Sequence, residues 1–310
     1  MRIVVVGSGG TGGYFGAKLA KAGEAVTFVA RGAHLQAIRE NGLTIRSAVE
    51  GGWNVRADAV ERLDDHPVAD LVLLCVKSFD TEDAAELVRP VLGPRTGVLS
   101  LQNGIDNEDK IARILGPDHV MGGVAYVFSN IEAPGVIAHH QLGRIALGEM
   151  KGGISDRAVA VAEACQRAGI EAEVDPQIRR TLWRKYVFLV ALSGTTAVTR
   201  LPVQFIREVR ATRQLWQRQV EELLALAWAD DAGLGTDTME SCVQLLESLA
   251  PTNYSSLYHD LMQGKRLELE ALHGHAIALG ARYNVPTPSL FAVYAALAPY
   301  LHGRPQSEPL

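Results

Sequence analysis

The sequence opens with MRIVVVGSGGTGGY, residues 1–14, and this stretch decides the fold around it. Arg2–Val6 is a short apolar run rich in β-branched residues, which is typical of a buried parallel strand. Residues 14–22 have the apolar spacing of a helix. The residues expected on the buried face of this helix are Phe15, Leu19 and Ala22. Between strand and helix, the pattern G-x-G-x-x-G is formed by Gly7, Ser8, Gly9, Gly10, Thr11 and Gly12.

Each glycine of this pattern has a physical purpose in a dinucleotide-binding turn. Gly7 permits the sharp bend, Gly9 lets the backbone approach a pyrophosphate, and Gly12 lets the helix pack close to the strand. The helix N-terminus then offers free N–H groups and a positive dipole end to the phosphates. A tight turn without a ligand is the alternative, but a strand before the pattern and a helix after it favour the dinucleotide site.

The second expected strand, residues 25–30, indicates which dinucleotide binds. In an NAD site an acidic residue usually ends this strand and binds the ribose 2′-hydroxyl. Here the strand is followed by Arg31, whose guanidinium matches the charge and geometry of a phosphate. The sequence therefore predicts NADP rather than NAD, with a solvated loop arginine as the alternative.

Composition limits the function classes. The chain has 310 residues, enough for about two domains, and a net charge of −5 with a pI near 6.0 argues against nucleic-acid binding. No apolar run reaches the length of a membrane span, and no signal peptide precedes the first strand. The three cysteines are far apart, so neither a disulfide framework nor a zinc site is expected. A cytoplasmic location fits these observations.

Residues 1–176 are expected to form an α/β domain with a doubly wound, mainly parallel sheet, because strands and helices alternate. Ligands of such sheets bind beyond the carboxyl ends of the strands. Two further loops are expected there, and they contain Lys77 and Asn103. Lys77 suits a phosphate or a carboxylate, or it is simply a surface lysine. Asn103 suits a ribose or a substrate hydroxyl, or it belongs to a plain turn. The remaining strands are expected at 43–46, 53–56, 70–76, 97–101, 120–127, 136–139, 144–148 and 171–174.

Residues 177–310 change character and are expected to form an all-α domain. Its helices are expected at 178–198, 205–230, 238–249, 255–263, 267–283 and 289–300. The first carries Lys185 in an otherwise apolar stretch, and Ser193 lies near the same face. Glu268 lies near the start of the fifth, where its charge suits the helix dipole. Lys185 and Glu268 could supply a proton donor and a carboxylate to orient it, or a purely structural ion pair.

Taken together, these segments make the chain resemble the 2-dehydropantoate 2-reductase (ketopantoate reductase) family over nearly its whole length. The resemblance is specific because several separated motifs agree. They are residues 7–12, CVKS at 75–78, LQNGID at 101–106, PGVIAH at 134–139, LGE at 147–149, LWRK at 182–185, and Ser255-Ser256 followed by Glu268.

The resemblance implies an N-terminal Rossmann domain, a helical C-terminal domain, an active site in the cleft, and NADPH-dependent reduction of a 2-oxo acid to a 2-hydroxy acid. By match to the family's motifs, Lys185 resembles the catalytic lysine and Glu268 the acid that supports it. Ser256 resembles the serine that contacts the substrate carboxylate. Lys77 and Asn103 resemble cofactor and active-site residues, and Arg31 resembles the ligand of the 2′-phosphate.

The chain departs from the family at two substrate positions. The family often has asparagines four and eight residues after the lysine, where this chain has Leu189 and Ser193. Leucine cannot hydrogen-bond a substrate hydroxyl, so a different 2-oxo acid is an alternative to 2-dehydropantoate. Leu267 also replaces a usual threonine.

Two further alternatives remain at this stage. The chain could be a dehydrogenase of another hydroxy acid, or an NADP-binding sensor without turnover, although a sensor needs neither Lys185 nor Glu268. The long apolar helices are compatible with packing within one chain or across a homodimer.

Overall fold

The computed structural model describes residues 1–305, which form two compact units. The first comprises Met1–Gln102 and Asp106–Thr181, and the second comprises Asn103–Ile105 and the chain from Leu182 onward. The sequence suggested a division after residue 176, whereas the units separate within helix α6 (Ile178–Thr199), whose first turn belongs to the first unit.

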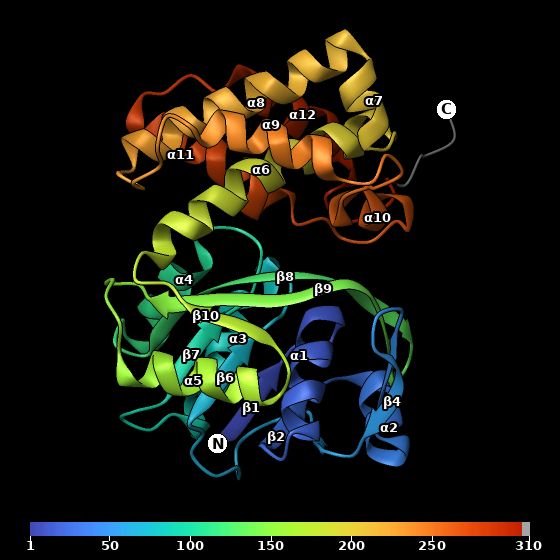
Figure 1. The fold of residues 1–310 in the computed structure, drawn as a ribbon, viewed down its shortest axis with the longest axis vertical. Helices are drawn as coiled ribbons and strands as arrows, with labels where there is room; N and C mark the ends of the chain where they lie inside the picture. Colours follow the sequence, from blue (N-terminus) through green and yellow to red (C-terminus); the bar gives the residue numbers. More distant parts are fainter. Residues whose placement is uncertain (306–310) are drawn as a thin grey trace. The chain divides into compact units, whose positions relative to one another are not determined.

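The first unit is built on one ten-stranded sheet, which confirms the α/β expectation (Figure 1). The strand order is β4-β3-β9-β8-β7-β6-β1-β2-β5, and β10 pairs with β9. Pairing is parallel except between β3 and β4 and between β8 and β9. The strands are β1 (Arg2–Val6), β2 (Ala25–Val29), β3 (Leu43–Ser47), β4 (Gly51–Val55), β5 (Asp58–Val60), β6 (Leu71–Leu74), β7 (Gly97–Ser100), β8 (Val120–Ala133), β9 (Val136–Glu149) and β10 (Glu171–Val174).

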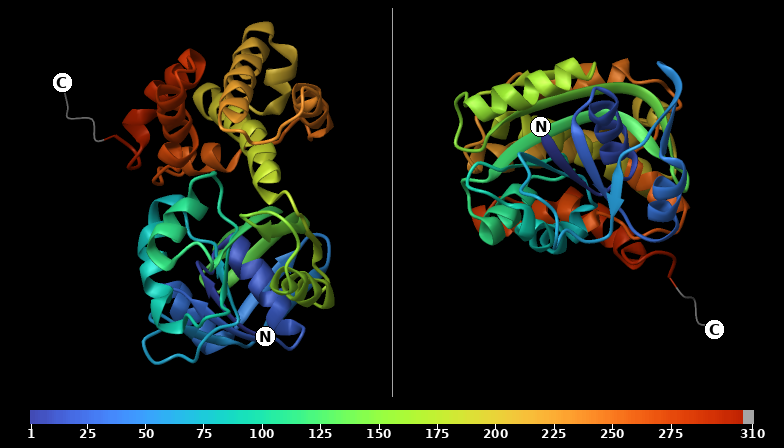
Figure 2. Two further views of the ribbon diagram at one scale, coloured as in Figure 1. Left: turned by 90° about the vertical axis from the view of Figure 1, so that its left-hand side faces the viewer. Right: turned by 90° about the horizontal axis from the view of Figure 1, so that it is seen from below.

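Helices cover both faces of this sheet because its central strands are apolar on both sides. Along β1, Ile3 and Val5 join a core with α1, α2 and α5, whereas Val4 and Val6 join a second core with α3 and α4. Figure 2 (left) shows α3 and α4 in teal on one side and α5 in yellow-green on the other. These helices are α1 (Gly10–Lys21), α2 (Gly32–Asn41), α3 (Thr81–Val88), α4 (Asn107–Leu115) and α5 (Asp156–Arg167).

Helix α1 begins earlier than expected. It starts at Gly10 rather than at Tyr14, so the last three residues of the glycine pattern form its first turn. Phe15 and Leu19 are buried as predicted, but Ala22 is exposed at the C-cap position, and its placement on the buried face was wrong.

Strands β8 and β9 are much longer than the sequence suggested. The segments 136–139 and 144–148 are parts of the single strand β9, which pairs with β8 across three register shifts (Figure 1). The hairpin of β3 and β4 is confirmed, and β3 also pairs in parallel with β9, so the hairpin extends the sheet.

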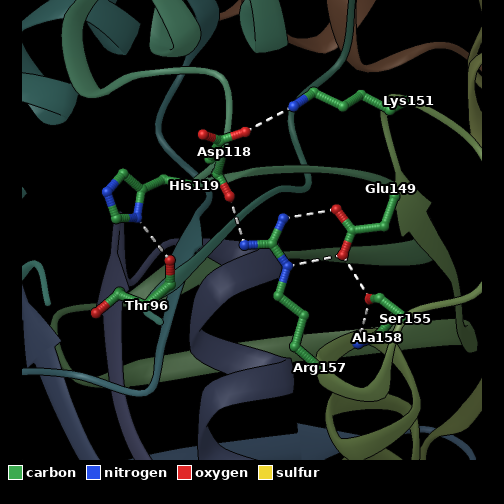
Figure 3. Close-up of polar contacts among 8 residues, drawn as sticks. All are labelled: Thr96, Asp118, His119, Glu149, Lys151, Ser155, Arg157 and Ala158. Carbon is green, nitrogen blue, oxygen red and sulfur yellow. Dashed lines mark hydrogen bonds and ion pairs between the residues drawn. The ribbon is translucent and has the colours of Figure 1, made fainter. Parts of the chain in front are cut away.

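A polar network lies at the end of the strands opposite to the glycine pattern, where β8 starts and β9 ends (Figure 3). Arg157 donates to both carboxylate oxygens of Glu149, at 2.7 and 2.6 Å, and to the carbonyl of Asp118 at 2.6 Å. Ser155 caps α5 and donates to Glu149 at 2.5 Å. Glu149 is the acid of the LGE motif, so this motif has a structural role here: it joins the end of β9 to α5.

Replacing Glu149 with glutamine is expected to lower the free energy of unfolding by about 1.5–3 kcal/mol, the usual value of hydrogen bonds to charged groups. Burial would raise the pKa of Glu149, but hydrogen bonds from Arg157 and Ser155 outweigh burial and lower it. A carboxyl with a lowered pKa stabilises the fold above its unfolded pKa, and this contribution is lost as the pH falls through the folded pKa. Urea unfolding at neutral and at acid pH measures this effect. The difference in free energy of unfolding between the parent and Glu149→Gln should be smaller at acid pH.

The matched control for this prediction is Lys151→Ala, which breaks the exposed ion pair with Asp118. Exposed pairs contribute little because water and salt screen them. Equal losses for the two variants, or a Glu149→Gln loss independent of pH, would contradict the structural role of Glu149.

The second unit is helical, as expected, and one expected helix is broken. The segment 205–230 contains the end of α7, an extended Val209, and α8. The Arg207 guanidinium bonds the carbonyls of Leu246 and Leu249, which holds α7 against the end of α9. After the long helix α6, the helices are α7 (Val203–Glu208), α8 (Arg210–Ala229), α9 (Thr238–Ser248), α10 (Ser256–Met262), α11 (His275–Tyr283) and α12 (Pro288–Leu297).

The fifth expected helix is also altered, because it starts at Leu269 and opens with a π-helical turn, η3 (Glu270–Gly274). The buried core of the unit is formed by α6, α8, α9 and α11 around Trp183, Trp216 and Leu246. Over residues 1–305, we find no helix whose length and apolar character would let it cross a membrane.

Candidate active site

The first unit brings together the predicted cofactor residues that follow β1, β2 and β6, three neighbouring parallel strands. Gly7 has φ +91°, a left-handed value that favours glycine, and a Cβ there would lie 2.6 Å from the backbone N of Val76. A Cβ on Gly12 would lie 2.2 Å from the carbonyl oxygen of Gly7, so α1 packs as closely as predicted. A Cβ on Gly9 meets no atom of the described chain within 4 Å, so this side of the motif is open.

The N-terminus of α1 has the features of an anion site. No side chain in residues 1–305 caps it by a hydrogen bond, and its first turn, which includes Gly10, Thr11 and Gly12, contains no acidic residue. The N–H groups of this turn and the dipole are therefore not neutralised by the protein's own side chains.

Ser8 and Arg31 connect the glycine motif to the end of β2. Ser8 is buried, and its hydroxyl donates to the carbonyl of Val29 at 3.1 Å, so its side chain holds the turn; its role in cofactor binding stays a prediction. Arg31 lies two residues further along, exposed at the N-cap of α2. An exposed arginine thus follows β2 at the start of α2, and its role as a ligand of a 2′-phosphate stays a prediction.

Lys77 is exposed and follows β6, as predicted. Its loop is held by Gln102, whose side-chain amide donates to the carbonyl of Val76 at 3.1 Å and to the hydroxyl of Thr81 at 2.7 Å. Gln102 is buried, and the sequence analysis assigned it no role. It directly precedes Asn103, which is half-buried and groups with the second unit.

The second unit holds the predicted catalytic and substrate residues on elements that contact one another. Lys185 is half-buried on α6, between Trp183 and Tyr186, which are both buried in the core. The Tyr186 hydroxyl donates to the carbonyl of Leu272 in η3. Glu268 is 7% exposed just before this turn, and Leu267 and Leu269 on either side are buried in an apolar cluster. The segments that carry Lys185 and Glu268 are therefore fixed against each other.

A series of buried side-chain hydrogen bonds also joins η3, α8 and α6. His273 in η3 approaches the side-chain oxygen of Gln219 at 3.2 Å, and the Gln219 amide donates to the hydroxyl of Thr195 at 2.9 Å. Gly194 allows this contact, since a Cβ there would lie 2.3 Å from Nε2 of His273. Burial lowers the pKa of His273 to about 3, so the ring is neutral at ordinary pH. No local sequence pattern predicts these contacts.

The two predicted substrate serines differ in exposure. Ser193 is fully buried, and its hydroxyl has no hydrogen-bond partner within residues 1–305. Ser256 is exposed in the first turn of α10. Ser255 is the buried one of the pair: it caps α10 and contacts the hydroxyl of Thr196 at 2.8 Å, which attaches α10 to α6. The substrate roles of Ser193, Ser256 and Asn103 stay predictions.

Comparison with known proteins gives one consistent answer. A family model described as "Ketopantoate reductase PanE/ApbA" matches residues 3–152, and one described as "Ketopantoate reductase PanE/ApbA C terminal" matches residues 177–300. The chain is 31% identical to the 2-dehydropantoate 2-reductase of Mesorhizobium japonicum, over 95% of this chain and 96% of that protein. The enzyme of the same name from Pyrococcus horikoshii is 30% identical, with the same coverage of both chains.

Solved structures agree with these relatives. The crystal structure of a PanE/ApbA family ketopantoate reductase from Ralstonia eutropha JMP134 matches with a TM-score of 0.90 and 30% identity, over 97% of this chain and 98% of that one. A ternary structure of D-mandelate dehydrogenase with NADH and anilino(oxo)acetate matches with a TM-score of 0.88 but 21% identity, over 97% and 98%, which shows a shared fold. From these matches and the two-unit fold, the chain belongs to the PanE/ApbA ketopantoate reductase family and is an oxidoreductase.

Proposed function

We propose that the protein uses NADPH to reduce a 2-oxo acid to the 2-hydroxy acid, with 2-dehydropantoate as the first substrate to test. The observation that supports this most directly is that one chain has both kinds of site. Its first unit has a glycine-motif helix without a side-chain cap, and its second unit has a lysine and a glutamate on two segments joined by the Tyr186–Leu272 hydrogen bond. The relatives named as 2-dehydropantoate 2-reductases support the substrate class.

In the proposed mechanism, NADPH, when bound, supplies a hydride to the 2-oxo carbon. The Lys185 ammonium donates a hydrogen bond to the carbonyl oxygen and then transfers a proton to the developing alkoxide. Lys185 becomes a neutral amine and regains a proton from water. Glu268 holds the ammonium in place, and Arg31 and Lys77 bind the phosphates of the cofactor.

The experiment is NADPH oxidation, followed by the loss of the cofactor's near-ultraviolet absorbance, with 2-dehydropantoate and with 2-oxo acids that lack its hydroxymethyl group. Preference for 2-dehydropantoate supports the proposal as stated. Leu189, which is partly buried against the helical core, favours a second candidate, the reduction of a less polar oxo acid. Faster turnover of acids without the hydroxyl would select that candidate. Tight NADPH binding with no turnover of any acid would indicate a sensor.

Replacing Arg31 with alanine is expected to weaken NADPH binding about 10- to 100-fold, because hydrogen bonds to charged groups contribute about 1.5–3 kcal/mol and each 1.4 kcal/mol is tenfold in affinity. NADH has no 2′-phosphate, so its affinity should stay nearly unchanged. Fluorescence titration with each cofactor measures both values. Arg62→Ala is the control, since Arg62 is exposed and pairs only locally with Asp64. Parent-like NADPH affinity in the Arg31 variant would remove Arg31 from the cofactor site.

A further inference from the structure

A histidine connects the glycine motif to a hairpin turn about a hundred residues away in the sequence. His34 is half-buried in the first turn of α2. Its Nε2 lies 2.8 Å from the carbonyl oxygen of Ser8, and its Nδ1 accepts a hydrogen bond of 3.0 Å from the backbone N–H of Gly135. Gly135 lies in the tight turn between β8 and β9.

These two contacts define the tautomer of His34. A backbone N–H can only donate, so Nδ1 facing Gly135 must be the unprotonated nitrogen. Nε2 therefore carries the proton, and it donates to the Ser8 carbonyl. The neutral ring thus acts as a connector with one acceptor and one donor, each matched to a backbone group.

The hairpin turn is itself held firmly against α2. Gly135 has φ +74°, and its carbonyl accepts a hydrogen bond of 2.9 Å from the N–H of Thr44 in β3. A Cβ on Gly135 would lie 2.9 Å from the Cβ of Ala37, so turn and helix are in close contact. The same hairpin touches the motif again, since a Cβ on Gly10 would lie 2.3 Å from the carbonyl oxygen of Ser129. His34 is therefore anchored on a rigid support.

The bond to the Ser8 carbonyl determines where the next N–H points. The peptide unit is planar and trans, so the N–H of Gly9 points opposite to the Ser8 carbonyl. Gly9 has no Cβ and tolerates either sign of φ, so rotation of this peptide unit meets little steric resistance. Rotation would turn the carbonyl oxygen toward a bound phosphate and the N–H away from it. The His34 donor opposes this rotation because it would lose its acceptor.

We infer that His34 is a positioning residue for the cofactor, which keeps the Ser8–Gly9 peptide in the orientation that presents the Gly9 N–H to the pyrophosphate. The inference rests on the proposed NADPH binding and deepens it. It also gives a role to the proline–glycine turn of the PGVIAH motif, which supplies the Gly135 N–H to this histidine.

The test compares three variants of His34 in the full-length protein. The amide of glutamine can approach the place of Nε2, and the shorter asparagine only that of Nδ1. We expect His34→Ala to weaken NADPH binding about tenfold in a fluorescence titration, His34→Gln to recover most of this loss, and His34→Asn to recover little. KM for NADPH should rise while kcat at saturating NADPH stays near the parent value. The melting temperature of the cofactor-free protein reports any general loss of stability.

The control is His140→Ala, which removes an exposed histidine of the same hairpin whose ring hydrogen-bonds the side chain of Asn130. Parent-like NADPH affinity in His34→Ala overturns the inference, as does equal weakening in all three His34 variants. If the alanine variant does not fold, the inference is tested by the difference in NADPH affinity between His34→Gln and His34→Asn. A parent protein that binds no NADPH would overturn the proposed function as well, which separates that failure from the loss of the His34 role alone.

Discussion

The Lys185→Ala variant is expected to lose about a hundred- to ten-thousandfold in kcat for 2-oxo acid reduction, the usual contribution of a general acid. NADPH affinity should stay within a few fold of the parent, because Lys185 belongs to the helical unit and the glycine motif to the sheet unit. Single-turnover kinetics with saturating NADPH measures the chemical step, and fluorescence titration measures binding.

A second substitution separates proton donation from charge. Lys185→Arg keeps a cation at this position, but a guanidinium does not release its proton at any ordinary pH. Substrate binding should therefore be partly retained while turnover stays low. Arg184→Ala is the matched control, because Arg184 is the adjacent, exposed cation of α6. Normal turnover in Lys185→Ala would exclude Lys185 from the mechanism.

Alanine at two glycines of one motif is expected to affect different properties: stability at Gly12 and NADPH affinity at Gly9. A Cβ on Gly12 would lie 2.2 Å from the carbonyl oxygen of Gly7 and 2.9 Å from the Cβ of Cys75. Backbone cannot move aside as a flexible side chain does, so Gly12→Ala should lower the free energy of unfolding by about 1–3 kcal/mol or more, as overpacking does. Urea unfolding of the cofactor-free protein measures this loss.

Gly9→Ala should leave the cofactor-free protein nearly as stable as the parent. Its φ of −74° suits alanine, and a Cβ there meets no described atom within 4 Å. The added methyl group would occupy the open side of the motif, where the pyrophosphate is proposed to approach, so NADPH affinity should fall at least tenfold. Retained NADPH affinity in Gly9→Ala would place the phosphates elsewhere.

The parts of the fold that were predicted correctly depend on short-range patterns. Strand β1, the glycine turn and α1 lie within the first 21 residues, and the local sequence pattern is enough to predict all three. Strand β9 was divided in two because its middle, with Gln141 and Leu142, is exposed and interrupts the apolar alternation. Val209 interrupts a continuous helical pattern, and the bonds of nearby Arg207 to the carbonyls of Leu246 and Leu249 are distant contacts that no local pattern predicts.

The candidate site shows the same division. Lys185, Glu268 and Arg31 were predicted as site residues because each is a charged residue that a sequence motif or a strand end singles out, and their roles stay predictions. His34 and Gln102 were missed because their importance lies in their partners: His34 joins Ser8 to Gly135, and Gln102 holds the loop of Lys77. The capping role of Ser255 was not predicted because capping depends on where α10 starts, a boundary that sequence patterns leave uncertain by a few residues. The substrate role of its neighbour Ser256 stays a prediction.

The parallel pairing of β3 with β9 sets an order for biosynthesis. Ser47 and His139, which face each other in this pair, are 92 residues apart, so the ribosome has made β3 and β4 long before β9 emerges. Until then, the edge of β3 that will pair with β9 has unpaired backbone groups, a template for pairing with another nascent chain. Chaperone dependence should therefore be greatest for stalled chains in which β4 has left the exit tunnel and β9 has not, and should fall once β9 has left it.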